Sequence, residues 1–282
     1  MRVIDSPAAM QDWAGKARLS GETIALVPTM GFFHAGHLAL MRKAKQLAGQ
    51  TVVSLFVNPL QFGPGEDLHR YPRDFAGDRQ AADEQGVDVL FAPAAAQMYA
   101  ADSATKIHIS TITDKFCGAS RPGHFDGVAT VVGKLFHLVL PHFAVFGEKD
   151  WQQLAVIRRM VRDLNWPVEI VGHPIVREAD GLAMSSRNTY LSEQQRQKAV
   201  YLYEALCLAG RLASKGEKDR RTIEREVRRF LGAVEDAEVE YAAIVNGESF
   251  AAPDLIDGNS VLLLAVRFGT TRLIDNGRIL PS

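Results

Sequence analysis

The sequence has few cysteines, no excess of either charge and no long apolar run. Its 2 cysteines, Cys117 and Cys207, are too few and too far apart for a disulfide framework or a cysteine zinc site. Its 32 Lys and Arg residues balance 33 Asp and Glu residues, so no global positive field attracts nucleic acid or an anionic membrane. No apolar run reaches the roughly 18 residues of a membrane span, and residues 1–7 lack the apolar core of a signal peptide. These absences predict a cytoplasmic protein that binds neither nucleic acid nor membrane.

The first part of the chain alternates short apolar runs with longer helical patterns. With 47% hydrophobic and 23% charged residues over 282 positions, the composition is typical of a globular chain of one large domain or two ordinary ones. The alternation predicts parallel strands joined by crossover helices, an α/β doubly wound, Rossmann-like sheet. Strands are expected at residues 23–27, 51–57, 87–91, 143–146 and 168–171, and helices at residues 38–48, 75–85, 128–139 and 151–164.

The pattern changes after residue 175. Two charged helical segments, residues 192–215 and 220–231, precede strand-like runs at residues 239–245, 261–266 and 272–279, which are separated by glycine turns. The sequence therefore predicts a Rossmann-like domain over residues 1–175 and a smaller α+β domain over residues 176–282.

Two histidines mark the loop after the first of these predicted strands. Residues 28–37 read Pro-Thr-Met-Gly-Phe-Phe-His-Ala-Gly-His, between the strand at 23–27 and the helix at 38–48. Unpaired backbone N–H groups and the positive end of the helix dipole face the occupant of such a turn. Gly31 and Gly36 are small enough to let a phosphate approach the backbone. His34 and His37 are therefore predicted to line an anion site.

A second string, residues 183–187, reads Ala-Met-Ser-Ser-Arg. Ser185, Ser186 and Arg187 offer two hydroxyls and a guanidinium that can bind the far end of a triphosphate. Alone, such a string is more typical of a solvated loop, but with the two histidines it predicts a nucleotide site. Polar residues also follow two other predicted strands, at 58–61 and 148–153, at the edge where doubly wound sheets bind ligands.

These strings resemble the pantothenate synthetase family, whose members ligate pantoate and β-alanine with ATP at a His-x-Gly-His site. The resemblance covers nearly the whole chain. The other matching strings are Phe-Val-Asn-Pro-Leu-Gln-Phe at 56–62, Tyr-Pro-Arg at 71–73, Arg-Pro-Gly-His-Phe at 121–125, Phe-Gly-Glu-Lys-Asp-Trp-Gln-Gln at 146–153 and Arg-Glu-Ala-Asp-Gly-Leu at 177–182. Departures are mild: Ala35 replaces a frequent Glu, Phe32-Phe33 a frequent Ala-Leu, and Trp151 a common Tyr.

The resemblance implies a two-step reaction. Pantoate's carboxylate attacks the α-phosphorus of ATP to give pantoyl adenylate and pyrophosphate, and the β-alanine amine then attacks the acyl carbon and expels AMP. The catalytic residues that it implies are His37, His34, Lys149, Ser185, Ser186 and Arg187. Further ATP contacts are implied for Met30, Gly31, Gly147, Asp150, Val176 and Met184.

The acid and amine sites are implied in the same way. Gln61 and Gln153 are expected to bind pantoate through their amides, and Asn58 to support that pocket. Arg121 and His124 either contact β-alanine's carboxylate or shape and close their loop. Mg²⁺ is expected to arrive on the ATP phosphates with no set of protein ligands, Asp78 being only a candidate contact. The family also implies a homodimer.

Other functions stay open at this point. A related adenylyltransferase would have an acceptor site rich in Arg and Lys, and an aminoacyl-tRNA synthetase fragment would carry a basic or aromatic RNA-binding appendage. A non-catalytic nucleotide sensor would bind ATP without turnover. The spacing of His34 and His37 also fits a zinc pair, although a zinc hydrolase needs a third ligand and a general base, and no His-Glu-x-x-His string is present.

Overall fold

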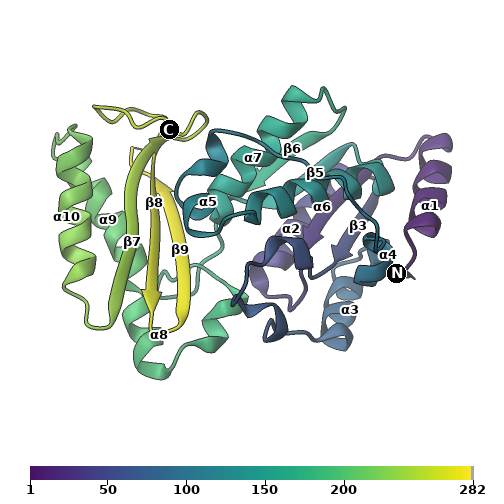
Figure 1. Cartoon of the computed structure of the whole chain (residues 1–282), viewed down its shortest axis with the longest axis horizontal. Coiled ribbons are helices and arrows are strands. Elements are labelled where there is room, and N and C mark those ends of the chain that lie inside the picture. The colour runs from purple at the N-terminus through teal and green to yellow at the C-terminus, as the bar shows by residue number, and fades with distance from the viewer. Residues whose placement is uncertain (281–282) are drawn as a thin grey trace. The chain divides into compact units, whose positions relative to one another are not determined.

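The protein is described by a computed structural model that covers residues 1–280 (Figure 1). The chain forms two compact units, one of residues 1–148 and 152–174, the other of residues 149–151 and from 175 onward. The division after residue 174 lies one residue from the predicted boundary. Residues 149–151, however, group with the second unit, whereas the sequence placed them in the first.

The first unit contains a sheet of six parallel strands in the order β1-β4-β3-β2-β5-β6. The strands are β1 (Arg2–Ile4), β2 (Ile24–Thr29), β3 (Gln50–Leu55), β4 (Val89–Phe91), β5 (Phe143–Gly147) and β6 (Glu169–His173). The predicted fold class is confirmed. The sequence did not predict β1, a strand of three residues of which only Ile4 is buried.

Helices and short 3₁₀ turns connect these strands. The helices are α1 (Pro7–Leu19), α2 (Ala35–Leu47), α3 (Phe75–Glu84), α4 (Ala95–Met98), α5 (Cys117–Ser120), α6 (His124–Val139) and α7 (Trp151–Asp163). The 3₁₀ turns are η1 (Pro59–Gln61), η2 (Asp67–His69), η3 (Ile112–Asp114) and η4 (Glu148–Asp150). Helix α1 was also not predicted, because only Met10 and Ala14 on it are fully buried and its apolar stripe is narrow.

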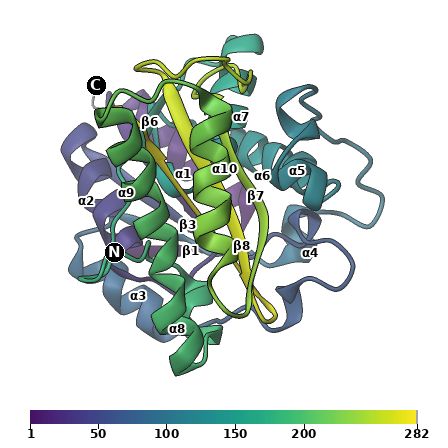
Figure 2. The same ribbon diagram turned by 90° about the vertical axis from the view of Figure 1, so that its left-hand side faces the viewer.

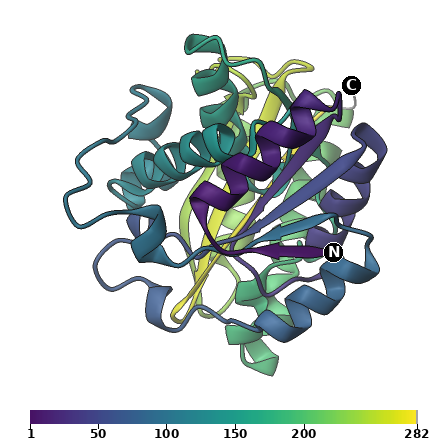
Figure 3. The ribbon, with the colours of Figure 1, turned by 90° about the vertical axis from the view of Figure 1, so that its right-hand side faces the viewer.

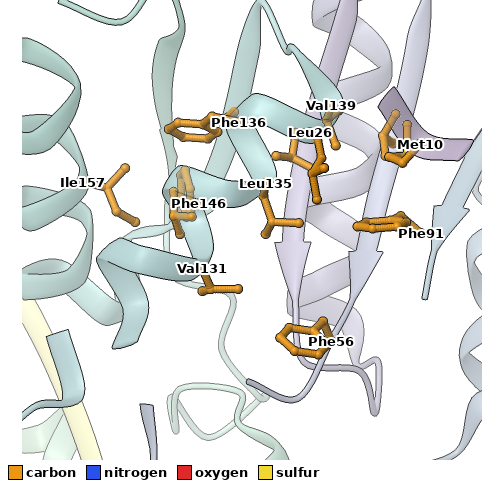
Figure 4. Close-up of a cluster of buried hydrophobic side chains, with 14 of the residues drawn as sticks. Met10, Leu26, Phe56, Phe91, Val131, Leu135, Phe136, Val139, Phe146 and Ile157 are labelled. Carbon is orange, nitrogen blue, oxygen red and sulfur yellow. The ribbon is translucent and has the colours of Figure 1, made fainter. Parts of the chain in front are cut away.

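The central strands are buried on both faces. Successive residues of a strand point to opposite sides of the sheet, so each strand contributes side chains to both apolar layers. Ile24 and Leu26 of β2 join the apolar cluster that α1, α6 and α7 cover. Ala25 and Val27 join a second cluster with α2 and α3. Figure 3 shows the purple α1 lying across the sheet, and Figure 4 shows side chains of the first cluster.

The strand order reverses between β2 and β5. Strand β2 pairs with β3 over six residues, from Ile24 to Thr29, but with β5 only at Ala25 and Leu26. Beyond Leu26 the β2–β5 ladder ends, although both strands continue toward their carboxyl ends. Doubly wound sheets bind ligands at such a reversal, outside the carboxyl ends of the strands.

Helix α6 and the turn η1 approach each other unusually closely at Gly127. A Cβ atom built there would lie 2.3 Å from the Leu60 carbonyl oxygen and 2.6 Å from the Gln61 nitrogen. The Gly127 carbonyl also accepts a hydrogen bond from the Asn58 amide at 3.0 Å. Only glycine at this position lets the helix fix the backbone that carries Gln61.

The second unit packs helices on an antiparallel sheet in the order β7-β8-β9. Its elements are η5 (Ser186–Tyr190), α8 (Glu193–Ala199), α9 (Tyr201–Ser214), α10 (Arg220–Gly232), β7 (Ala237–Asn246), β8 (Ser260–Phe268) and β9 (Thr271–Arg278). Figure 2 shows α9 and α10 side by side over the sheet. Ile223, Val227 and Leu231 form the buried stripe of α10.

The predicted helix at residues 192–215 is in fact two helices. They meet at Val200, whose carbonyl accepts the Tyr203 N–H at 2.9 Å, an i to i+3 bond that tightens the turn. Within residues 1–280, no helix combines the length and the apolar character that crossing a membrane requires.

We expect Gly127→Ala to destabilise the first unit, because the added methyl group overlaps backbone atoms of η1 that cannot rotate away. Overpacking of this kind costs about 1–3 kcal/mol, measured as the change in the free energy of unfolding in urea. Gly15→Ala is the matched control: it lies inside α1 with nothing within 4 Å of the added atom. That variant should be neutral or more stable by up to about 1 kcal/mol. Equal effects of the two substitutions would contradict the role given to Gly127.

Candidate active site

A buried carboxylate shapes the turn that follows β2. Asp78, on α3, accepts the backbone N–H of Phe32 at 2.8 Å and of Phe33 at 2.6 Å. Gly31 and Phe32 both have positive φ, +86° and +54°, and a Cβ atom on Gly31 would lie 2.8 Å from an Asp78 oxygen. The turn is therefore folded tightly around this carboxylate.

Holding this turn is a role for Asp78 that the sequence did not reveal. Its side chain is only 4% exposed, and burial raises the pKa of the carboxyl group, while the two N–H groups act in the opposite direction. Both Asp78 oxygens already accept backbone N–H groups. These contacts give no support to the predicted contact between Asp78 and Mg²⁺, which stays a prediction. Among residues 1–280, no three His, Cys, Asp or Glu side chains are grouped as a metal site requires.

The two histidine side chains accept backbone N–H groups at the start of helix α2. The Nδ1 atom of His34 accepts the Gly36 N–H at 3.1 Å, and the Nδ1 atom of His37 accepts the His34 N–H at 3.3 Å. A neutral imidazole that accepts at Nδ1 carries its proton on Nε2. The ring centroids are 4.1 Å apart, so the structure brings together two imidazoles that both have donor character at Nε2.

The next polar cluster lies on η1, after β3. The Gln61 amide nitrogen donates to the Met30 sulfur at 2.9 Å, and the Asn58 amide donates to the Gln61 amide oxygen at 3.2 Å. Asn58 and Gln61 are 1% and 9% exposed. The structure therefore joins Met30, predicted to contact ATP, with Asn58 and Gln61, predicted to form the pantoate site.

Arg121 and His124 grip the backbone of the same turn. The Arg121 guanidinium donates to both carboxylate oxygens of Glu66, at 2.8 and 2.6 Å, and to the Gln61 carbonyl at 3.2 Å. Nδ1 of His124 lies 2.8 Å from the same Gln61 carbonyl. Of the two predicted roles, these contacts favour shaping of the loop, because they use the donors on Nε and Nη2 of Arg121, while Nη1 lies 3.0 Å from Nε2 of His124.

Glu66 responds electrostatically to this arrangement. Partial burial alone would raise its pKa, but the Arg121 hydrogen bonds and charge outweigh burial and lower the pKa below its ordinary value of 4.5. Nothing in the sequence pattern singled out Glu66, since a lone Glu in a polar loop is typically solvated.

A second glutamine, Gln152, is a further residue that the sequence analysis missed. It is 5% exposed, donates to the carbonyls of Ile112 and Lys115 at 2.8 Å each, and accepts the Cys117 N–H at 3.0 Å. It thereby anchors the segment that leads to Arg121. Its neighbour Gln153, predicted to bind pantoate, is only partly buried at the start of α7.

Residues Lys149–Trp151 are fastened to the second unit. The Lys149 carbonyl accepts the Asn276 amide at 2.8 Å, and the Trp151 indole N–H donates to the Gly247 carbonyl at 2.9 Å. The Arg278 guanidinium lies over the Trp151 ring, 5.5 Å from its centroid. These contacts explain why Lys149 and Asp150 belong with the second unit although they directly follow β5.

The Ser-Ser-Arg string forms the start of a 3₁₀ turn. The Ser185 hydroxyl caps η5 by accepting the Arg187 N–H at 3.2 Å, and Ser186 is buried. The Met184 N–H donates to the Val176 carbonyl at 3.0 Å, so two predicted nucleotide contacts are neighbours in one short hairpin.

Charged side chains hold this hairpin in place. Arg177 donates to both oxygens of the fully buried Asp275 carboxylate, at 2.7 and 2.9 Å. Glu178 accepts the Asn188 amide at 2.9 Å and an Arg196 N–H at 2.6 Å. The loop that presents Ser185 and Arg187 is therefore tied to strand β9 by the Arg177–Asp275 pair and to helix α8 by the partly exposed Glu178–Arg196 pair.

The predicted site residues divide between the two units. The first unit carries Met30, Gly31, His34, His37, Asn58, Gln61, Arg121, His124, Gly147 and Gln153. The second carries Lys149, Asp150, Val176, Met184, Ser185, Ser186 and Arg187. Hydrogen bonds join Met30, Asn58, Gln61, Arg121 and His124 in the first unit, and Val176 with Met184 in the second.

Comparison with known proteins identifies the family of this chain. The family model described as pantoate-beta-alanine ligase matches residues 2–278. The chain belongs to the pantoate-beta-alanine ligase family. It is 52% identical over 276 residues to the pantothenate synthetase of Geobacter sulfurreducens, covering 98% of each chain, and 51% identical over 280 residues to that of Syntrophotalea carbinolica, covering 99% of each.

Solved structures agree with this assignment to the pantoate-beta-alanine ligase family. The crystal structure of pantothenate synthetase from Thermus thermophilus superposes with a TM-score of 0.94 at 48% identity, with full coverage of both chains. A pantoate-beta-alanine ligase from Francisella tularensis, complexed with beta-gamma ATP and beta-alanine, has a TM-score of 0.82 at 29% identity over 100% of this chain and 99% of that one. The predicted family and ligase function are confirmed, whereas the roles of single residues stay predictions.

Asp78→Ala should loosen the turn after β2, because it leaves two buried N–H groups without an acceptor. We expect a loss of about 3 kcal/mol in the free energy of unfolding and weaker binding of ATP, measured by calorimetry. Asp74→Ala removes a carboxylate from the same helix start, where it caps α3 at Gly77, and should cost about 1 kcal/mol without changing ATP affinity. Unchanged ATP affinity in Asp78→Ala would contradict the positioning role.

The Glu66–Arg121 pair should make stability depend on pH. Because the folded-state pKa of Glu66 is lowered, its contribution is complete above the unfolded value of about 4.5 and is lost as the pH falls through the folded-state value. We expect Glu66→Gln to cost about 1 kcal/mol at pH 7 and the difference from the unsubstituted protein to vanish in acid. Urea titrations at pH 7, 5 and 3.5 measure the difference in the free energy of unfolding between the two proteins. If that difference were the same at every pH, the pair would make no ionic contribution to stability.

Proposed function

We propose that the histidine turn of the first unit stabilises charge on the phosphates while pantoate's carboxylate attacks the α-phosphorus of ATP. The observation that carries this assignment is that Nδ1 of His34 accepts the Gly36 N–H and Nδ1 of His37 accepts the His34 N–H, which puts the proton of each neutral ring on Nε2. Two preset N–H donors match a reaction that needs positioning and charge stabilisation more than a protein nucleophile. His37, in the first turn of α2, is the more critical donor.

Four further residues supply the remaining positive charge and hydroxyls in this proposal. Lys149, Ser185, Ser186 and Arg187 neutralise the triphosphate and the departing pyrophosphate. Met30, Gly31, Gly147, Asp150, Val176 and Met184 contact the nucleotide. Mg²⁺, when bound, would add charge neutralisation at the phosphates. Asp78 is a weak candidate for contact with it, because both of its oxygens already accept backbone N–H groups.

The acid and amine are bound in the first unit in this proposal. Gln61 and Gln153 bind pantoate, with Asn58 supporting Gln61. Arg121 and His124 keep the Gln61 backbone in place while the β-alanine amine attacks the acyl carbon of pantoyl adenylate and releases AMP. A cytoplasmic location remains a prediction from the composition of the sequence, and a homodimer remains a prediction from the family resemblance.

The two half-reactions can be tested separately. Pantoate with Mg·ATP should support exchange of labelled pyrophosphate into ATP without β-alanine, whereas sustained AMP release should require β-alanine. His37→Ala should reduce both activities by about 100-fold or more, because a preset donor to a developing oxyanion contributes about 3 kcal/mol.

The control for this experiment is His108→Ala, which removes an exposed histidine paired with Asp126 outside the turn. It should keep both activities. Loss of less than a few-fold in His37→Ala would remove this residue from the proposed chemistry. A chain that bound ATP but showed neither exchange nor AMP release would be a nucleotide sensor.

A further inference from the structure

Four side chains form a hydrogen-bonded row behind the turn η1. The row runs from Tyr99, next to α4, through Asn58 and Gln61 to Met30 at the end of β2. Tyr99 belongs to none of the motifs that suggested the function, and its hydroxyl is used by no step of the proposed reaction.

Backbone groups fix which way the Asn58 amide faces. Its oxygen accepts the Leu60 N–H at 3.2 Å, and its nitrogen donates to the Gly127 carbonyl at 3.0 Å. A backbone N–H can only donate and a carbonyl can only accept, so the reversed amide would face two mismatched partners. The Tyr99 hydroxyl, 3.0 Å from the same Asn58 oxygen, must therefore donate to it.

The orientation of Asn58 then determines that of Gln61. The Asn58 nitrogen also donates to the Gln61 oxygen at 3.2 Å, so the Gln61 NH₂ group points away from Asn58, toward the Met30 sulfur at 2.9 Å. A thioether is a weak acceptor and engages one of the two hydrogens. The row leaves Gln61 facing the site as a donor, which suits an oxygen acceptor such as a carboxylate.

Tyr99 keeps its donor role across the working pH range. Burial raises the pKa of Tyr99 to about 12, so its hydroxyl stays protonated. Its ring packs on Phe56, with centroids 6.2 Å apart, and the Lys134 ammonium lies 5.4 Å from the ring centroid. These contacts hold the hydroxyl in position over Asn58.

We propose that Tyr99 is a positioning residue of the acid-binding site, which through Asn58 holds the Gln61 amide with its NH₂ group toward the ligand. This inference rests on the proposed binding of pantoate by Gln61. It makes the site selective for an acid that presents an oxygen acceptor, rather than a hydrogen-bond donor, to Gln61.

Tyr99→Phe tests the proposal, because it removes the hydroxyl and keeps the ring. We expect kcat/KM for pantoate to fall about three- to tenfold, the range for one buried neutral hydrogen bond, with KM for ATP unchanged. Tyr201→Phe is the matched control, since this tyrosine lies in the second unit and packs on Phe230. It should leave both parameters unchanged. Equal weakening of pantoate and ATP by Tyr99→Phe would overturn the proposal.

A double-mutant cycle separates positioning from a general structural role. If Tyr99 acts through Gln61, its substitution should change kcat/KM for pantoate by less than twofold when Gln61 is already Leu. The same fold-change in both backgrounds would show that Tyr99 acts by another route. The ratio kcat/KM is read from the initial slope of rate against pantoate, so it does not require saturation.

The side-chain amide signals of Asn58 and Gln61 in ¹⁵N NMR spectra give a readout that is independent of turnover. Gln61→Leu identifies the Gln61 pair by its disappearance, and Tyr99→Phe should shift that pair and the Asn58 pair. Absence of any shift would overturn the proposal even if rates fell. Failure of the unsubstituted enzyme to use pantoate would instead refute the proposed function and leave the amide orientation to be judged by NMR alone.

Discussion

The turn after β2 depends on a single buried carboxylate that receives two backbone N–H groups. Asp78 reaches that turn from α3, and its oxygens take the place of solvent for Phe32 and Phe33. Gly31 adopts its positive φ without strain, but the positive φ of Phe32 is costly unless such contacts stabilise it. The direction in which α2 leaves the turn, and with it the geometry of His34 and His37, follows from this contact.

In the first unit, backbone groups that can only donate or only accept a hydrogen bond determine which side-chain atoms act as donors. The N–H groups of Gly36 and His34 determine which imidazole nitrogens carry protons, and the Leu60 N–H and Gly127 carbonyl determine how Asn58 faces. Side chains that could present either a donor or an acceptor are thereby committed before a ligand arrives. Such commitment is what electrostatic preorganisation requires, because no reorientation is needed as charge develops.

Local pattern was sufficient to predict the parallel sheet and the strand-to-helix turn that carries His34 and His37, since buried strands and such turns are encoded by neighbouring residues. It failed for β1 and α1, where few residues are buried. It also missed Asp78, Gln152 and Tyr99 as positioning groups. Each of them bonds to a partner 35 to 46 residues away along the chain. Such partners become visible only once the fold brings them together.

The contacts of Arg121 constrain how β-alanine can be recognised. Nε and Nη2 of Arg121 hold Glu66, and Nη1 lies 3.0 Å from Nε2 of His124. To bind a substrate carboxylate through the edge formed by Nε and Nη2, Arg121 would have to leave Glu66, and Glu66, of which about a quarter is exposed, would lose a bidentate partner. Replacing the Glu66 carboxylate by the substrate carboxylate would gain little binding free energy unless Glu66 found a new hydrogen-bond donor. The Gln61 carbonyl would also lose one of its two contacts, which would loosen the turn that carries the acid-binding amide. Retaining the Glu66 pair throughout the reaction avoids both losses, so the contacts favour the loop-shaping role for Arg121.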